Sequence, residues 1–183
     1  PIGELHAGRL ATYPAGEYGG CGEYGSEALD PIETMFRHYP QQWLGDSDPD
    51  RPWSPAVVHR AQTPVWHHFW YATQNTMRQW VESSQRHQSW ATRTMTDAFR
   101  RRADVLISIA VHLLIDAYPA GWMKSLVSVD RTPKPAYFEL ADALTPVACN
   151  LRTDRHAVYE GDEARVELWL LNDTSVAHIE SRL

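Results

Sequence analysis

The sequence is poor in cysteine and has no long hydrophobic run. Its two cysteines, Cys21 and Cys149, stand far apart and lack the CxxC spacing of metal or redox sites. No apolar run reaches the roughly 18 residues that a membrane-spanning helix needs, and no signal peptide is recognisable. The sequence therefore predicts no membrane association, and it leaves the cellular compartment open.

Basic charge is also scarce. Lysine and arginine number 17 against 23 aspartates and glutamates, which gives a net charge of −6. Nucleic-acid binding needs a concentrated basic surface, so we predict no nucleic-acid partner. The basic cluster Arg100-Arg101-Arg102 follows a helical stretch, where cations suit the C-terminal end of a helix.

Aromatic residues are abundant. The 183 residues include eight tryptophans, eight tyrosines and nine histidines, and 43% are hydrophobic, which is enough for a packed core. Aromatic rings stack well on the apolar faces of sugars, but they also fill protein cores. Both interpretations stay open from composition alone.

Glycine and proline divide the first third of the chain. Residues 1–30 are rich in glycine, which indicates tight turns or a close approach to a ligand. Residues 40–64 carry five prolines and an acidic turn, Asp46-Ser47-Asp48-Pro49-Asp50. We predict a long surface loop here, of a kind that often carries function.

The middle of the chain predicts helices and buried strands. Residues 65–102 have helical periodicity, and we expect two helices that meet near 73–76. Residues 105–115 are apolar and β-branched, as expected of a strand buried on both faces of a parallel sheet. Residues 125–130 are a shorter strand candidate, and 135–144 a short helix that begins at proline.

After Pro146 the hydrophobic period changes to two, which indicates antiparallel strands on either side of a turn at 160–162. We expect about three strands in this stretch, which cannot close a sandwich, and the chain begins with Pro1 rather than methionine. We therefore expect a piece of a longer polypeptide. Residues 1–146 read as an α/β unit that fits part of a (β/α)₈ barrel, and 147–183 as the beginning of a β domain.

The sequence predicts no metal and no cofactor. His67 and His68 are adjacent, whereas zinc ligands on one helix prefer i and i+4 spacing. The acidic turn imitates the opening of a calcium loop, but Arg51 and Val57 stand where that loop needs glycine and glutamate.

The best catalytic candidate is Glu23, which lies between glycines in the segment Gly22-Glu23-Tyr24-Gly25. A carboxylate flanked by glycines suits the end of a strand, with its backbone close to substrate. Barrel enzymes place catalytic groups at the C-terminal ends of their strands. Glu17-Tyr18-Gly19 repeats the local motif, so Glu17 is the fallback.

Several motifs resemble glycoside hydrolase family 2, which includes β-galactosidases, β-mannosidases and β-glucuronidases. Four motifs follow one another in the family's order. Glu23-Tyr24-Gly25 resembles the nucleophile strand, and residues 80–88 resemble the family's helix of the Trp-x-Glu-Ser-x-Gln type. Asp116-Ala117-Tyr118-Pro119 resembles the segment after the eighth barrel strand, and Val129-Asp130 with Pro133-Lys134-Pro135-Ala136-Tyr137 resembles the segment before the last helix.

The resemblance implies the C-terminal part of a TIM barrel followed by the start of an immunoglobulin-like β-sandwich. It also implies a retaining glycosidase with Glu23 as nucleophile. The sugar contacts would include Tyr24, Asp116 and Tyr118. The family's acid/base glutamate would lie upstream of Pro1, so the isolated chain is expected to be inactive.

The sequence departs from the family at the eighth strand. His112 stands where the family has tryptophan, and Ile115 where it has asparagine. His112 is either a sugar contact or a hydrogen-bonded core histidine. Trp43 and Trp53 either form the rim of a sugar cleft or anchor the loop between them. A non-catalytic carbohydrate-binding or structural module is therefore the alternative.

Overall fold

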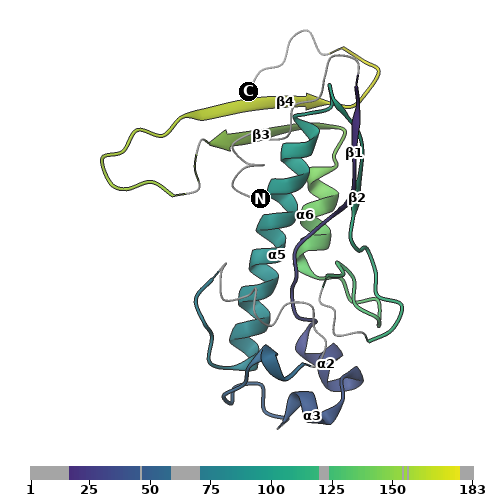
Figure 1. Ribbon diagram of the computed structural model, residues 1–183, viewed down its shortest axis with the longest axis vertical. Coiled ribbons are helices and arrows are strands. Elements are labelled where there is room, and N and C mark those ends of the chain that lie inside the picture. The colour runs from purple at the N-terminus through teal and green to yellow at the C-terminus, as the bar shows by residue number, and fades with distance from the viewer. Residues whose placement is uncertain are drawn as a thin grey trace.

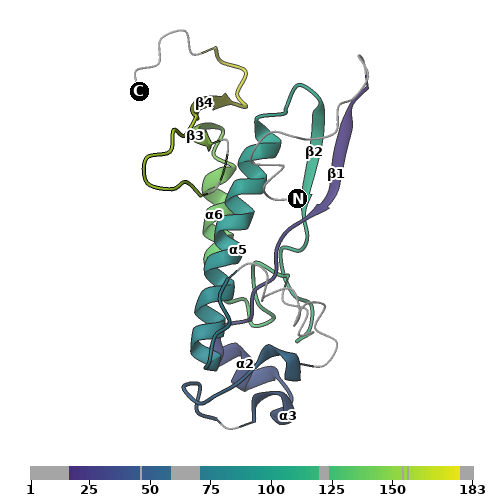
Figure 2. The ribbon, with the colours of Figure 1, turned by 60° about the vertical axis from the view of Figure 1, so that its left-hand side comes forward.

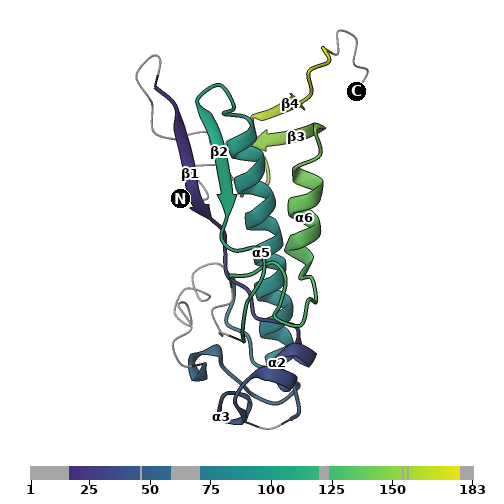
Figure 3. The ribbon, with the colours of Figure 1, turned by 90° about the vertical axis from the view of Figure 1, so that its right-hand side faces the viewer.

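The computed structural model describes residues 17–45, 47–58, 71–119, 124–153, 155 and 157–177. Its centre is a β–α–β unit, in which strand β1 (Gly19–Tyr24) pairs in parallel with β2 (Leu106–Val111) and helix α5 (Met77–Arg100) connects them. Figure 3 shows the two strands side by side, with α5 lying along them. Tyr24 and three residues of α5 form the core between the sheet and the helix: Ala91, Met95 and Phe99.

The sequence predicted two helices that meet near 73–76, and helix α5 begins directly after this junction. Thr76 caps it, because its hydroxyl accepts a hydrogen bond from the backbone N–H of Gln79, whose side chain in turn caps Thr76. This capping box places the start of the helix at Met77. The first part of the predicted helical stretch, 65–70, lies outside the described residues.

Strand β2 is covered on one face, which corrects the prediction of a strand buried on both. Leu106, Ile109 and Val111 pack toward α5, whereas Ile107 on the other face is 73% exposed. The predicted strand at 125–130 is also wrong. Its Val127 forms only isolated bridges to Ile115 and Pro133, because the chain turns back at once through a tight turn.

The stretch predicted as a surface loop does lie at the surface in its described part, 40–45 and 47–58, where most side chains are exposed, but it contains two short helices and buries Leu44, Pro55 and Val58. Helix α2 (Ile32–His38), helix α3 (Gln41–Leu44) and the 3₁₀ helix η1 (Pro55–Val57) gather at the lower end of α5 in Figures 1 and 2. Prolines directly before or at the start of each short helix set the backbone direction there. A shared core holds this region, formed by Leu29, Met35, Leu44, Val58, Met77, Trp80 and Val81.

The last helix confirms the sequence prediction. Helix α6 (Pro135–Ala143) begins at a proline and lies beside α5 (Figure 3). Its residues Ala136 and Leu140 are buried with Leu126, which precedes it in the chain. Because α6 follows β2 as α5 follows β1, the chain alternates strand and helix.

A two-stranded antiparallel hairpin follows α6. Strands β3 (Val147–Thr153) and β4 (Val166–Asn172) pair throughout their lengths. Arg100, at the end of α5, pairs with Asp173 at 2.8 Å and donates to the carbonyl of Pro146, which ties the hairpin to the helices. The basic cluster that the sequence placed at a helix end thus serves as an attachment point.

The described residues form a mixed α/β structure with two small sheets of two strands each. A complete barrel is not present among them. None of the described helices has both the length and the apolar character needed to cross a bilayer.

A buried ion pair joins the segment after β1 to the start of α6. Lys134 Nζ lies 3.2 Å from Asp30 Oδ1, and both side chains are almost fully buried. Burial by itself raises the pKa of Asp30, but Lys134 and the hydrogen bonds from Ser128 and Tyr39 outweigh it and hold that pKa below its ordinary value. Lys134 also donates to the carbonyl of Ala28 at 2.9 Å.

We predict that Lys134→Met lowers the free energy of unfolding by about 3–5 kcal/mol, because Asp30 would remain buried without its cation. Urea unfolding measures this change. Arg37→Met is the matched control: Arg37 also pairs with an aspartate, Asp130, but its side chain is 62% exposed. The control should change stability by less than about 1 kcal/mol. Equal losses in both variants would contradict the argument.

A second prediction concerns pH. Burial lowers the pKa of His87 from 6.5 to about 4. The unfolded chain therefore binds more protons than the folded one between these values, so stability should fall as the pH drops from 6.5 toward 4 and then level off. His87→Phe keeps a ring between Tyr71 and Trp90 and should flatten this part of the profile. The urea midpoint against pH tests it, and an unchanged slope would refute it.

Candidate active site

Glu23 lies at the C-terminal end of β1, in a β-bulge. Cys21 pairs with Ile109 and Tyr24 with Val111, so β1 uses one residue more than β2 over the same length. A bulge changes the direction of side chains, and here both Gly22 and Glu23 are turned outward. The Glu23 side chain is 74% exposed.

Tyr24 points the other way, into the core. Its hydroxyl shares a hydrogen bond of 2.9 Å with Thr96 Oγ1, and its ring packs edge-on against Phe99. Burial raises the pKa of Tyr24. A sugar contact needs a side chain that faces solvent, whereas Tyr24 is buried. The proposed site therefore does not include Tyr24. Its role is to fix the strand end next to Glu23.

His112 follows β2 and lies beside Glu23. Its backbone N–H donates to the Tyr24 carbonyl at 2.8 Å, and its Nε2 is 3.9 Å from Glu23 Oε1. The contact depends on Gly25, where an added Cβ would lie 2.5 Å from the His112 carbonyl oxygen. The two strand ends thus bring a carboxylate and an imidazole together.

The other residues predicted after β2 are placed differently. Asp116 is buried and accepts a hydrogen bond of 2.7 Å from Ser125 Oγ. Burial raises the pKa of Asp116. Tyr118, by contrast, is 67% exposed. Asp116 therefore braces the loop, and Tyr118 is the one of the two that is open to solvent.

Glu17 lies at the opposite end of β1 from Glu23. It precedes the first residue of the strand, Gly19, and is exposed. Six residues of strand separate the two ends by roughly 20 Å at about 3.3 Å per residue. Because Glu17 is at the N-terminal end, its position differs from that of catalytic groups in barrel enzymes.

Trp43 and Trp53 are neighbours. Trp53 Nε1 donates to the Trp43 carbonyl at 2.8 Å, so the pair anchors the loop between them. Both also line a pocket next to Met77 at the start of α5. Tyr24 contacts Thr96 near the other end of that helix, and the stretch from Met77 to Thr96 is about 28 Å long at 1.5 Å per residue. The tryptophans therefore lie far from Glu23.

Polar residues of α5 hold the segment after Glu23, a role that the sequence did not reveal. Gln88 Nε2 donates to the carbonyls of Ser26 and Ser125, at 2.9 and 3.2 Å. Ser84 accepts from the backbone N–H of Leu29, and Gln85 donates to the Leu29 carbonyl. These residues belong to the motif within residues 80–88, which resembles the family's helix but does not by itself reveal which loop its polar side chains bind.

Glu27 is a further carboxylate in this segment that the sequence did not single out. It is half-buried, and burial raises the pKa of its carboxyl group. No pattern of spacing distinguishes it from other glutamates, so its burial is visible only in three dimensions.

The described residues contain no group of three or more His, Cys, Asp or Glu side chains able to hold a metal ion. His67, His68 and Asp46, which entered the sequence argument about metals, lie outside the described residues.

Parallel strands joined by a helix, with polar groups at their C-terminal ends, are typical of α/β enzymes. Among solved structures, the chain is similar to β-D-mannosidase from Dictyoglomus thermophilum, with a TM-score of 0.63 and 14% identity. The match covers 94% of this chain but only 20% of the mannosidase chain. At this identity it shows a likeness of fold. No family model and no curated protein matches the sequence.

We predict that Gly25→Ala disturbs the contact between the strand ends. The new methyl group would meet the His112 carbonyl, and the resulting backbone shift should lower the free energy of unfolding by about 1–3 kcal/mol. Gly22→Ala is the matched control, since nothing lies within 4 Å of its added Cβ; its effect should stay within about 0.5 kcal/mol. Thermal unfolding compares the two, and equal effects would refute the close packing at Gly25.

Proposed function

We propose that this chain is the C-terminal part of a (β/α)₈ barrel and the start of a β-sandwich from a retaining glycoside hydrolase of family 2 type. The observation that carries the proposal is the position of Glu23, outward-facing at the C-terminal end of a parallel strand and 3.9 Å from His112 at the end of the next. The likeness of fold to a β-D-mannosidase, which is a glycosidase by name, supports it.

Glu23 would act as the nucleophile. Its carboxylate attacks the anomeric carbon and forms a glycosyl–enzyme ester, while the bond to the leaving group breaks and an acid protonates the departing oxygen. Water, deprotonated by the same acid/base group, then cleaves the ester and releases the sugar. We choose Glu23 over Glu17 because Glu23 lies at the C-terminal end of β1, where barrel enzymes place catalytic groups, and Glu17 lies at the N-terminal end.

The second carboxylate would come from a part of the barrel that the printed sequence does not contain. A retaining pair stands about 5 Å apart across the sugar, so the isolated chain is expected to be inactive. The exposed edges and the uncovered face of β1 and β2 would pack against that remaining part of the same polypeptide. Self-association of the chain is the other way to cover them.

His112, which lies beside Glu23, and the exposed Tyr118 are the proposed sugar contacts. The His112 imidazole lies next to the nucleophile and can donate a hydrogen bond to a sugar hydroxyl. Asp116, held by Ser125, would support these contacts from behind. No cofactor enters this chemistry, because two carboxylates and water complete it.

Glu23→Gln in the complete enzyme should lower kcat for aryl-glycosides on the order of 10⁴-fold, since an amide cannot form the ester intermediate. The matched control, Glu17→Gln, should leave kcat unchanged. A 2-fluoro glycosyl inactivator should label the peptide that carries Glu23, as read by mass spectrometry.

Normal turnover of the Glu23→Gln enzyme would show that the nucleophile lies elsewhere. If the unmodified complete protein binds sugars but hydrolyses no glycoside, the chain belongs to a non-catalytic carbohydrate-binding module instead.

A further inference from the structure

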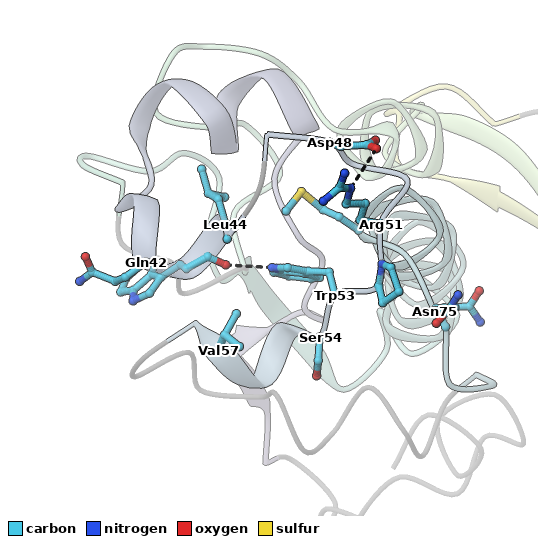
Figure 4. A pocket seen from close by; sticks show the side chains of 13 residues that line it. Gln42, Leu44, Asp48, Arg51, Trp53, Ser54, Val57 and Asn75 are labelled. Atoms are coloured by element: carbon cyan, nitrogen blue, oxygen red, sulfur yellow. Dashed lines mark hydrogen bonds and ion pairs between the residues drawn. The ribbon is translucent and has the colours of Figure 1, made fainter.

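A concave region lies at the other end of α5 from Glu23. It is a pocket of about 520 Å³ between α3, the loop that follows it, η1 and the first residue of α5 (Figure 4). Small-ligand sites typically have volumes of about 300–1,000 Å³. The lining residues that matter below are Gln42, Trp43, Asp48, Arg51, Trp53 and Asn75.

The pocket is held open by its own hydrogen bonds. The backbone N–H of Trp53 donates to the Asn75 carbonyl at 2.9 Å, and Trp80 Nε1 donates to the Trp53 carbonyl at 3.2 Å. Arg78 of α5 binds Asp50 of the same loop through two hydrogen bonds between exposed side chains. These contacts reduce the ordering that the residues around Asp50 and Trp53 would need when a ligand binds.

The lining combines aromatic rings with neutral and balanced polar groups. Trp53 stands in the middle of the pocket in Figure 4, with Gln42 and Asn75 at its edges. Asp48 and Arg51 lie 3.7 Å apart at the rim, both largely exposed, and their charges cancel. A site without net charge favours an uncharged ligand over a phosphate or a cation.

We propose that this pocket is a carbohydrate-binding site separate from the one at Glu23. Indole rings match the apolar faces of pyranose rings, and the amides, carboxylate and guanidinium supply both donors and acceptors for neighbouring hydroxyls. The choice of a carbohydrate over another neutral ligand rests partly on the proposed function.

The position of the pocket defines what it would do. The stretch of α5 between Met77, which lines it, and Thr96, which contacts Tyr24, is about 28 Å long. A single sugar cannot reach both places. The pocket would therefore hold a distant part of a long glycan and increase retention on a polymer, without changing the turnover of small glycosides.

The test uses the complete enzyme in native gels that contain soluble galactomannan. Arg51→Ala should weaken the retention of the protein by the polysaccharide roughly 10-fold, the effect of losing a hydrogen bond to a charged group. Gln42→Ala, from the other side of the pocket, should act in the same direction. Both side chains are exposed, so the fold should survive, and circular dichroism verifies this.

Arg86→Ala is the matched control, because Arg86 is an exposed arginine on α5 outside the pocket. It should leave retention unchanged, and none of the three variants should alter kcat/KM for an aryl-glycoside. Retention of the Arg51→Ala and Gln42→Ala proteins equal to that of the unmodified protein, or no retention of the unmodified protein, overturns the proposal.

The same gels run with the Glu23→Gln enzyme separate the two proposals. That variant should still be retained, since its pocket is intact. If Glu23→Gln leaves turnover normal while Arg51→Ala abolishes retention, the proposed nucleophile is wrong and the binding site stands.

Discussion

The buried ion pair between Lys134 and Asp30 is the interaction on which the arrangement of the strand ends depends. Two charges removed from water are tolerated only when they meet each other and further hydrogen-bond partners. Here those partners come from Ala28, Ser128 and Tyr39. The loop after β1, the loop after β2 and helix α2 are thereby joined at one point, which leaves little freedom for the loops that carry the candidate site.

The candidate site is built on this support. The bulge in β1 turns Glu23 outward while Tyr24 remains locked in the core, and Gly25 lets the His112 backbone approach. Gln88 of α5 then ties both loops to the helix from behind. A carboxylate that is 74% exposed thus stands on a buried base held by hydrogen bonds from Gln88, and such preorganisation is what positions catalytic groups.

Sequence patterns were most reliable where one local signal decided the outcome. The proline at the start of α6 and the change of period after Pro146 both predicted elements that the structure contains. The patterns failed where burial depends on distant partners. The apolar sequence of β2 gave no indication that its outer face is uncovered, and the apolar residues at 125–130 suggested a strand where the chain turns back at once.

By itself, the sequence determined the helix that ends in the basic cluster, the helix that begins at Pro135 and the antiparallel strands after Pro146, and it indicated Glu23 as the candidate nucleophile, because periodicity, prolines and flanking glycines act over a few residues. Only the tertiary structure decided which motif residues face the site. Tyr24 and Glu23 are adjacent in the chain but point in opposite directions. Lys134, which looked like part of a family motif, proved to be a buried counter-ion. Such roles arise from contacts between segments about 100 residues apart, as in the bond from Lys134 to Ala28, and no local pattern records them.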